Sequence, residues 1–405
     1  MKVFYLTCIY LLVNQLAIGQ QAPGSPYTYF GIGDINNKGY SQQLVTGGTG
    51  IANRNALSLN NLNPASYSAM VYPYSFLSEF GVSMSIAQRT DEDNQGTQAD
   101  MEFPYLGMIF KTGNKSGASL GLRQYSNVEY SIIGEDSFNG TSGTYRVLYD
   151  GNGGLNELYF GYGRSITDNF SLGGHLSYIF GTINNDQQLN SIDRSFDMSI
   201  EDSNFLRGLK MDFGAHYIKT FNESSIVFGA TYGVKSTLSS NRDLTIFETI
   251  SGTDTPFDSL SSESIDSDDY VLPQSFGLGV TYNHQSRWQV SLDFQTHLWS
   301  ATPLSGDDYE LRDSRRLSIG FEKLPNYNNP KALGRLSYGF GIFNEESYLI
   351  LDNEGLNNVG FTAGLTVPLG TRGFIRYIGE RATRGNGLTE FFSESYTKLT
   401  LSFTF

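Results

Sequence analysis

Hydrophobic and polar residues alternate with a period of two along much of the chain, which is the pattern of β-strands that have one apolar face. The last ten residues are the clearest case, because the Leu and Phe side chains of Leu399, Leu401, Phe403 and Phe405 all fall on one face. From residue 71 onward the pattern predicts fourteen strands. They cover roughly residues 71–88, 101–112, 117–133, 154–166, 170–184, 204–220, 224–238, 270–284, 287–300, 312–324, 332–345, 357–368, 371–383 and 395–405.

The connections between these strands alternate in length. Almost all of the even-numbered ones, such as 167–169 and 368–370, are tight turns, whereas the odd-numbered ones, such as 134–153 and 239–269, are long and polar and are expected to be loops. Short periplasmic turns, long extracellular loops, an even number of strands and a terminal aromatic residue are typical of outer-membrane barrels. We therefore predict an all-β fold, a 14-stranded antiparallel transmembrane β-barrel in the outer membrane of a Gram-negative cell.

The N-terminal part of the chain has a different composition. A short apolar stretch ends in the small residues of Ala17-Ile18-Gly19, which predicts a secretory signal peptide over residues 1–19. Residues 20–70 are rich in Gly and Asn and lack a period-two pattern, while the polar faces of the strands are too small to fill a barrel of this size. We predict that residues 20–70 form a hatch inside the lumen of a barrel made by residues 71–405; a disordered periplasmic tail is the alternative.

Charge and cysteine content narrow the classes of partner. The chain has 405 residues, with 41 acidic against 27 basic side chains and a net charge of −14, a balance that repels nucleic acid. Its one cysteine, Cys8, lies in the predicted signal peptide, so a disulfide framework is not expected in the mature chain. The mean hydropathy is −0.28, so a membrane protein of this composition must be a barrel rather than a helix bundle.

The sequence contains few residues in patterns typical of a catalytic or metal-binding site. Residues 91–102 partly match a calcium-binding loop, with Asp91, Asp93 and Glu102 at its first, third and twelfth positions, but Gln95 replaces the expected oxygen ligand and strands flank the loop. An acidic, solvated loop is the favoured interpretation. The histidines are scattered, and neither a catalytic triad nor a phosphate-binding loop is present. We predict neither an enzyme nor a cofactor.

Four stretches of sequence carry a family resemblance. Residues 47–52 (Gly-Gly-Thr-Gly-Ile-Ala) and 60–65 (Asn-Asn-Leu-Asn-Pro-Ala) resemble the N-terminal hatch of the long-chain fatty-acid transporter family, FadL, which also includes TodX-type barrels. Residues 272–280, followed by Arg287 and Trp288, are similar to a strand pair of that family. Residues 25–34 resemble the mature N-termini of FadL-like barrels of Bacteroidota.

The resemblance implies a function and a set of site residues. In the family the hatch closes the lumen, and its movement opens a route for an apolar ligand; this implies a gating role for Asn63, Pro64 and Ala65. The chain would then take up hydrophobic small molecules such as fatty acids or other lipids passively. Arg123 and Arg335 are candidate partners for a ligand carboxylate, because a fatty-acid pocket needs one or two cations.

A second function remains open. Some barrels of this kind are structural or accessory subunits of secretion or assembly complexes, where the partners are other outer-membrane proteins and the surrounding lipid. The two functions differ in what they require of the structure. A transporter needs a continuous apolar pocket, whereas a scaffold needs a sealed lumen and a surface that binds protein.

Overall fold

The computed structural model describes most of the predicted mature chain. The described ranges are 24–36, 38–70, 75–90, 95–137, 144–191, 196–250, 256–285, 287–304, 309–325, 332–351, 353–369, 373–385 and 393–405. The predicted signal peptide therefore lies outside the described residues.

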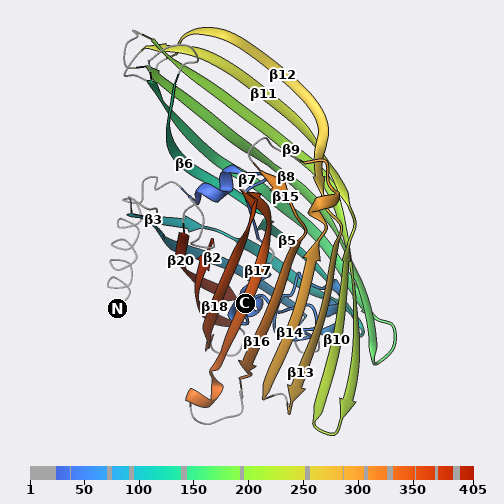
Figure 1. Cartoon of the computed structure of the whole chain (residues 1–405). Helices are drawn as coiled ribbons and strands as arrows, with labels where there is room; N and C mark the ends of the chain where they lie inside the picture. Colours follow the sequence, from blue (N-terminus) through green and yellow to red (C-terminus); the bar gives the residue numbers. More distant parts are fainter. Residues whose placement is uncertain are drawn as a thin grey trace, which may run out of the picture.

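Fourteen strands close into an antiparallel barrel, as the sequence predicted (Figure 1). Each strand pairs with the next, and the last pairs with the first across residues 79–90 and 393–404. In order around the barrel the strands are β2 (Phe76–Thr90), β4 (Tyr105–Gly113), β5 (Ser116–Gln124), β7 (Thr144–Ser165), β8 (Phe170–Ser191), β9 (Phe196–Phe221), β10 (Ser224–Gly233), β13 (Ser275–His284), β14 (Trp288–His297), β16 (Ser314–Lys323), β17 (Ser337–Leu351), β18 (Glu354–Leu369), β19 (Gly373–Arg384) and β20 (Ser393–Thr404). Each predicted strand has its counterpart in the barrel.

Several connections that we expected to be loops are instead strands. β3 (Gln95–Glu102) precedes β4, and both β11 (Ser236–Ile250) and β12 (Pro256–Leu272) lie between β10 and β13. β6 (Ser126–Ser137) follows β5; most of it lies within the predicted strand 117–133, and only its end lies in the connection that we expected to be a loop. β7, β8 and β9 are 22, 22 and 26 residues long and extend well past the barrel beside β6, β11 and β12 (Figure 1). We call this extension, on the side of the long connections, the extracellular sheet. The loop prediction for residues 239–269 was therefore wrong, because pairing with β9 satisfies the backbone of a segment too polar to show an apolar face.

The outward face of the barrel is apolar. Along β8 and β9 the exposed side chains include Leu172, Leu176, Leu209 and Phe213, each separated by inward residues. Exposed Phe and Leu side chains continue this belt around β13, β14, β17 and β18. Because a closed barrel satisfies its own backbone hydrogen bonds, this apolar surface can face lipid. The protein is an outer-membrane β-barrel.

Residues 24–70, the N-terminal segment, are almost entirely buried against the inward face of the barrel. The segment contains η1 (Pro26–Tyr29), β1 (Asp34–Ile35), the five-residue helix α2 (Ser41–Val45) and η2 (Pro64–Ala69). Short η3 (Trp299–Ala301) and η4 (Ala332–Arg335) lie in later connections. No helix among the described residues has the length and hydropathy needed to cross a membrane.

Glycines on the inward face of the wall let the N-terminal segment approach closely. A Cβ atom added at Gly277 would lie 2.7 Å from the Ile51 side chain, and one at Gly229 would overlap the Ile51 carbonyl. The small inward residues, which the sequence analysis took as too small to fill the barrel, therefore admit the backbone of the segment.

Candidate functional site between the N-terminal segment and the wall

The predicted gating motif consists of Asn63, Pro64 and Ala65. It lies near the C-terminal end of the N-terminal segment, where η2 meets the wall. Asn63 caps η2, because its Oδ1 accepts a hydrogen bond from the Ala65 N–H at 3.0 Å. Its Nδ2 donates to the Ile51 carbonyl at 2.7 Å and to the Ala215 carbonyl of β9 at 3.2 Å. Pro64 starts the helix at the position that proline favours. The motif therefore joins two parts of the segment to the barrel wall.

Buried carboxylates of the wall also bind the segment. Asp293 of β14 is 1% exposed, and its Oδ2 accepts hydrogen bonds from the Gly50 and Ile51 backbone N–H groups at 2.6 and 2.7 Å. Glu322 of β16 accepts a hydrogen bond from Gln42 Nε2 at 2.7 Å. Both acids therefore hold the N-terminal segment against the wall.

Apolar side chains fill much of the remaining lumen. Toward the extracellular end, Ile32 of the segment joins a cluster of inward side chains from the wall, with Tyr29 and Phe30 packed against it. The cluster members from the wall include Val128, Tyr130, Leu155, Ile179, Leu206, Leu238, Leu272, Trp299 and Tyr348. Toward the other end, Tyr40, Leu59 and Tyr67 pack against Leu77, Tyr105 and Tyr159. The apolar groups that a hydrophobic ligand would contact are thus already packed against protein.

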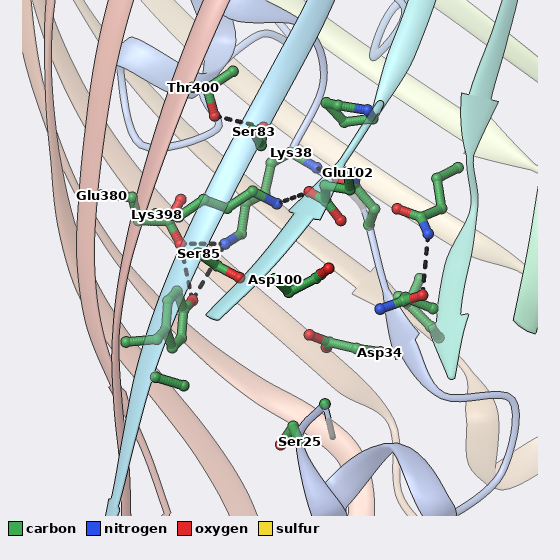
Figure 2. A pocket seen from close by; sticks show the side chains of 18 of the residues that line it. Ser25, Asp34, Lys38, Ser83, Ser85, Asp100, Glu102, Glu380, Lys398 and Thr400 are labelled. Carbon is green, nitrogen blue, oxygen red and sulfur yellow. Dashed lines mark hydrogen bonds and ion pairs between the residues drawn. The ribbon is translucent and has the colours of Figure 1, made fainter. Parts of the chain in front are cut away.

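Toward the extracellular end, the wall has a gap between β3 and β6, and the start of the N-terminal segment lies in this gap. Among the described strands, β3 pairs only with β2, and β6 pairs with β7 and, through two residues, with β1. Between them, Thr28 Oγ1 donates to the Glu129 carbonyl at 2.8 Å and accepts from the Glu129 N–H at 3.0 Å. A cavity of about 160 Å³ remains beside this contact (Figure 2).

The lining of the cavity includes ten charged residues together with polar and apolar ones. Lys38 of the N-terminal segment forms an ion pair with Glu380 of β19 at 2.5 Å, and Lys398 of β20 forms one with Glu102 of β3 (Figure 2). The other charged residues that line it are Asp34, Asp100, Glu129, Glu345, Arg384 and Glu394. Carboxylates and ammonium groups of this density bind water and ions rather than hydrocarbon.

A second lumen cavity of about 80 Å³ lies beside Asn61 and Leu62. Arg123 lines it and is engaged by the Glu157 carboxylate and by the Asn36 carbonyl, to which its Nη1 donates at 2.7 Å. His175, Lys210, Asp212 and His297 also line this cavity. Arg123 therefore already has a carboxylate partner within the protein.

The remaining predicted residues lie elsewhere. Arg335 is exposed in η4, at the end of the barrel opposite to Arg123, so the structure does not bring the two arginines together. Asp91 and Asp93 fall outside the described residues, while Glu102 is in strand β3 and paired with Lys398.

Sequence reasoning missed the charged residues of β19. Arg376, Glu380 and Arg384 are all buried and lie four residues apart on the inward face of this strand. Arg384 forms an ion pair with Asp34 of the N-terminal segment at 2.6 Å, and Arg376 Nη1 donates to Ser41 Oγ at 2.7 Å. An even spacing of charges in a strand whose other face is apolar was the signal that could have found them.

An apolar hollow does occur, but on the outward face of the barrel. It has a volume of about 540 Å³ and lies over Ala215 and Ala230, between larger side chains such as Phe228 and Leu278. The large apolar side chains that border this hollow face lipid.

The family of the chain follows from a match over its whole length. The family model described as BamG matches residues 1–405. The chain belongs to the BamG family. No curated protein sequence matches it.

Solved structures of FadL-type barrels share the fold of this BamG-family chain, as the sequence resemblance implied. The toluene transporter TbuX of Ralstonia pickettii is 16% identical, with a TM-score of 0.59 over 91% of this chain and 98% of its own. CymD, a monoaromatic hydrocarbon channel, is 14% identical, with a TM-score of 0.59 over 93% and 98%. A FadL homologue of Pseudomonas aeruginosa is 11% identical, with a TM-score of 0.57 over 85% and 93%. These neighbours are channels rather than enzymes.

Proposed function

We propose that this barrel is a structural subunit of an outer-membrane complex that assembles or secretes other proteins. The observation that carries the proposal is the packing of the described N-terminal segment against the inward face of the barrel. Its apolar side chains are packed against the N-terminal segment, and the cavities beside the segment are lined by ion pairs. The family name BamG is compatible with this function, which the sequence analysis left open.

A hydrophobic ligand would meet two obstacles in this lumen. It would have to displace packed side chains, and it would have to strip water from charged groups that offer it no hydrogen bond in return. The gap between β3 and β6 is bordered by Gln98, Asp100 and Glu129, so it gives an apolar molecule no apolar way out toward lipid. A barrel that holds other proteins in place has no need of such a pathway.

Passive uptake of hydrophobic molecules is the second candidate, because the fold is that of toluene and hydrocarbon channels. In this function the N-terminal segment is a hatch, and Asn63, Pro64 and Ala65 are the residues whose movement opens it. Arg123 would receive a ligand carboxylate only after release from Glu157.

The experiment that separates the two is purification of the full chain in mild detergent, followed by mass spectrometry of the bound molecules. Other outer-membrane proteins at fixed stoichiometry support the structural subunit. A barrel that purifies alone with fatty acid or hydrocarbon bound contradicts it. Depletion of the chain from cells gives an independent measurement: we expect the levels of other outer-membrane proteins to fall, whereas entry of toluene should not change.

A further inference from the structure

The extracellular sheet has a free edge at β12. β11 pairs with β9 on one side and with β12 on the other, and among the described strands β12 pairs with β11 alone (Figure 1). Residues 261–266 of β12 therefore have a paired strand on one side alone among the described strands. A long open edge of this kind is a template for a strand of another chain.

Two side chains on this edge are apolar and exposed. Phe257 and Leu260 are 61% and 53% exposed. Each of them lies at a β-bulge, where the register with β11 shifts because β12 has one more residue than β11. Such bulges re-aim side chains away from the regular face of a sheet. Between the bulge at Leu260 and the barrel, residues 261–266 pair regularly with β11 and leave a six-residue edge.

The three outermost strands are strongly acidic. Residues 196–206, 239–250 and 256–266 contain a single basic side chain, Arg242, which forms a bidentate ion pair with Asp202 at 2.7 and 2.8 Å. Against it stand eight carboxylates: Asp197, Glu201, Asp202, Asp243, Glu248, Asp258, Glu263 and Asp266.

Some of these carboxylates are directly opposite each other on the outward face. Asp186 of β8 lies opposite Asp150 of β7 on one side and opposite Glu201 of β9 on the other. Burial, together with the charges of Glu201 and Asp150, raises the pKa of Asp186 above its usual value. Like charges that lie opposite each other destabilise a sheet, so a cationic surface bound over this row of carboxylates would stabilise it.

We infer that the edge of β12 binds a protein outside the cell, which adds a strand along residues 261–266 and sets lysine or arginine side chains against the carboxylates of the outward face. The inference rests on the proposed function and extends it, because it names the surface through which this subunit binds its partner. A second copy of this chain is a poor occupant, because it would bring two acidic faces together. Anionic lipid headgroups are repelled in the same way.

The test is photo-crosslinking in intact cells from the full-length chain. A photoreactive residue at Ser262, which is exposed on the edge strand, is compared with one at Glu223, which is exposed in the turn between β9 and β10 at the other end of the barrel. We expect one protein to be joined at position 262 and not at 223. The triple variant Glu201→Gln, Asp243→Asn, Asp266→Asn should lower the yield of that adduct about tenfold at equal expression, and added salt should lower it for the unmodified chain.

Four results would overturn the inference. The first is the absence of an adduct at position 262, and the second is an adduct between two copies of this chain. The third is an adduct to lipopolysaccharide whose formation a metal chelator prevents. The fourth is an adduct whose yield the triple variant does not change. Heat-modifiable migration of each variant in gels shows that its barrel is folded. If mild-detergent purification still yields stoichiometric partners while position 262 stays unlinked, the docking edge is wrong and the structural subunit stands. If no partner purifies, the proposed function itself fails.

Discussion

The strands β7, β8 and β9 pass through two regions that differ in almost every physical respect. In the membrane each has two neighbours, an outward face of Leu, Phe and Tyr, and an inward face that the N-terminal segment covers. In the extracellular sheet the same strands have a polar outward face, and among the described strands their sheet ends at β12, which pairs with β11 alone.

The comparison shows which region of the protein is filled by its own chain and which region is accessible to partners. In the lumen, buried ion pairs and close backbone contacts engage many of the polar groups, although buried atoms such as Asn53 Oδ1, Asn61 Oδ1 and His216 Nδ1 have no hydrogen-bond partner among the described residues. Outside the membrane, backbone groups and carboxylates remain available. Specific binding is therefore expected at the extracellular sheet rather than along the axis of the barrel.

The largest effect should come from breaking an ion pair of the lumen. Lys38 is 19% exposed at its side chain and Glu380 5%, so Lys38→Met leaves a carboxylate buried without its cation. We expect a loss of about 3–5 kcal/mol in the free energy of unfolding. The measurement is the temperature at which heat-modifiable migration in gels is lost.

The matched control is the exposed pair of Lys115 and Asp168, whose side chains are 56% and 86% exposed. Lys115→Met should leave stability nearly unchanged, because water already screens that pair. Equal effects of the two variants would show that the N-terminal segment is not held by buried charge.

A smaller effect is expected from a pair of neighbouring glycines in β8. A Cβ at Gly173 would lie 2.6 Å from the Ala65 nitrogen, whereas one at Gly174 faces outward and lies 3.6 Å from the Phe213 ring. Gly173→Ala should cost about 1–3 kcal/mol through overpacking and displace the Asn63-Pro64-Ala65 turn. We expect faster entry of large hydrophilic antibiotics into cells that carry this variant.

Gly174→Ala provides the comparison on the opposite face of the same strand. It should leave antibiotic entry unchanged, because the outward face at that position has room for a methyl group. If Gly173→Ala leaked no more than Gly174→Ala, the segment would not be the barrier that closes the lumen. If it instead raised uptake of toluene, the channel function would gain support.

The smallest effect concerns the carboxylates of the extracellular sheet. The raised pKa of Asp186 means that its ionised form is disfavoured in the folded sheet, so the sheet is weaker above that pKa and regains strength as pH falls through it. Asp186→Asn should therefore stabilise the sheet by about 0.2–1 kcal/mol at pH 7 and by less at acidic pH. Hydrogen–deuterium exchange of β8 peptides measures this gain.

Asp243→Asn is the control on the same outward face. Asp243 lies opposite Ser203 and Ser264 rather than opposite another acid, so its neutralisation should leave exchange in the sheet nearly unchanged. A gain from Asp243→Asn equal to that from Asp186→Asn would mean that net charge, and not the row of opposing carboxylates, governs the sheet.

The strands were predictable where one face met lipid. Segments such as 276–282 and 288–294 alternate because their outward residues, among them Leu278 and Phe294, must be apolar. β11 and β12 were missed because both of their faces meet water over much of their length, which removes the alternation. The site was predictable only in part: Asn63 lies in the N-terminal segment and contacts the wall, whereas Arg335 is exposed in η4, away from Arg123.

The sequence by itself determined the membrane barrel and its number of strands, because the period-two alternation of apolar residues is a local property imposed by lipid. Its glycines showed that the inward face is small, but not what fills the space. Only the tertiary structure decided that the N-terminal segment rests on those glycines, that Lys38 meets Glu380 across 342 positions of sequence, and that β12 ends a sheet with a free edge. These features depend on contacts between distant residues, and no local pattern of polarity encodes them.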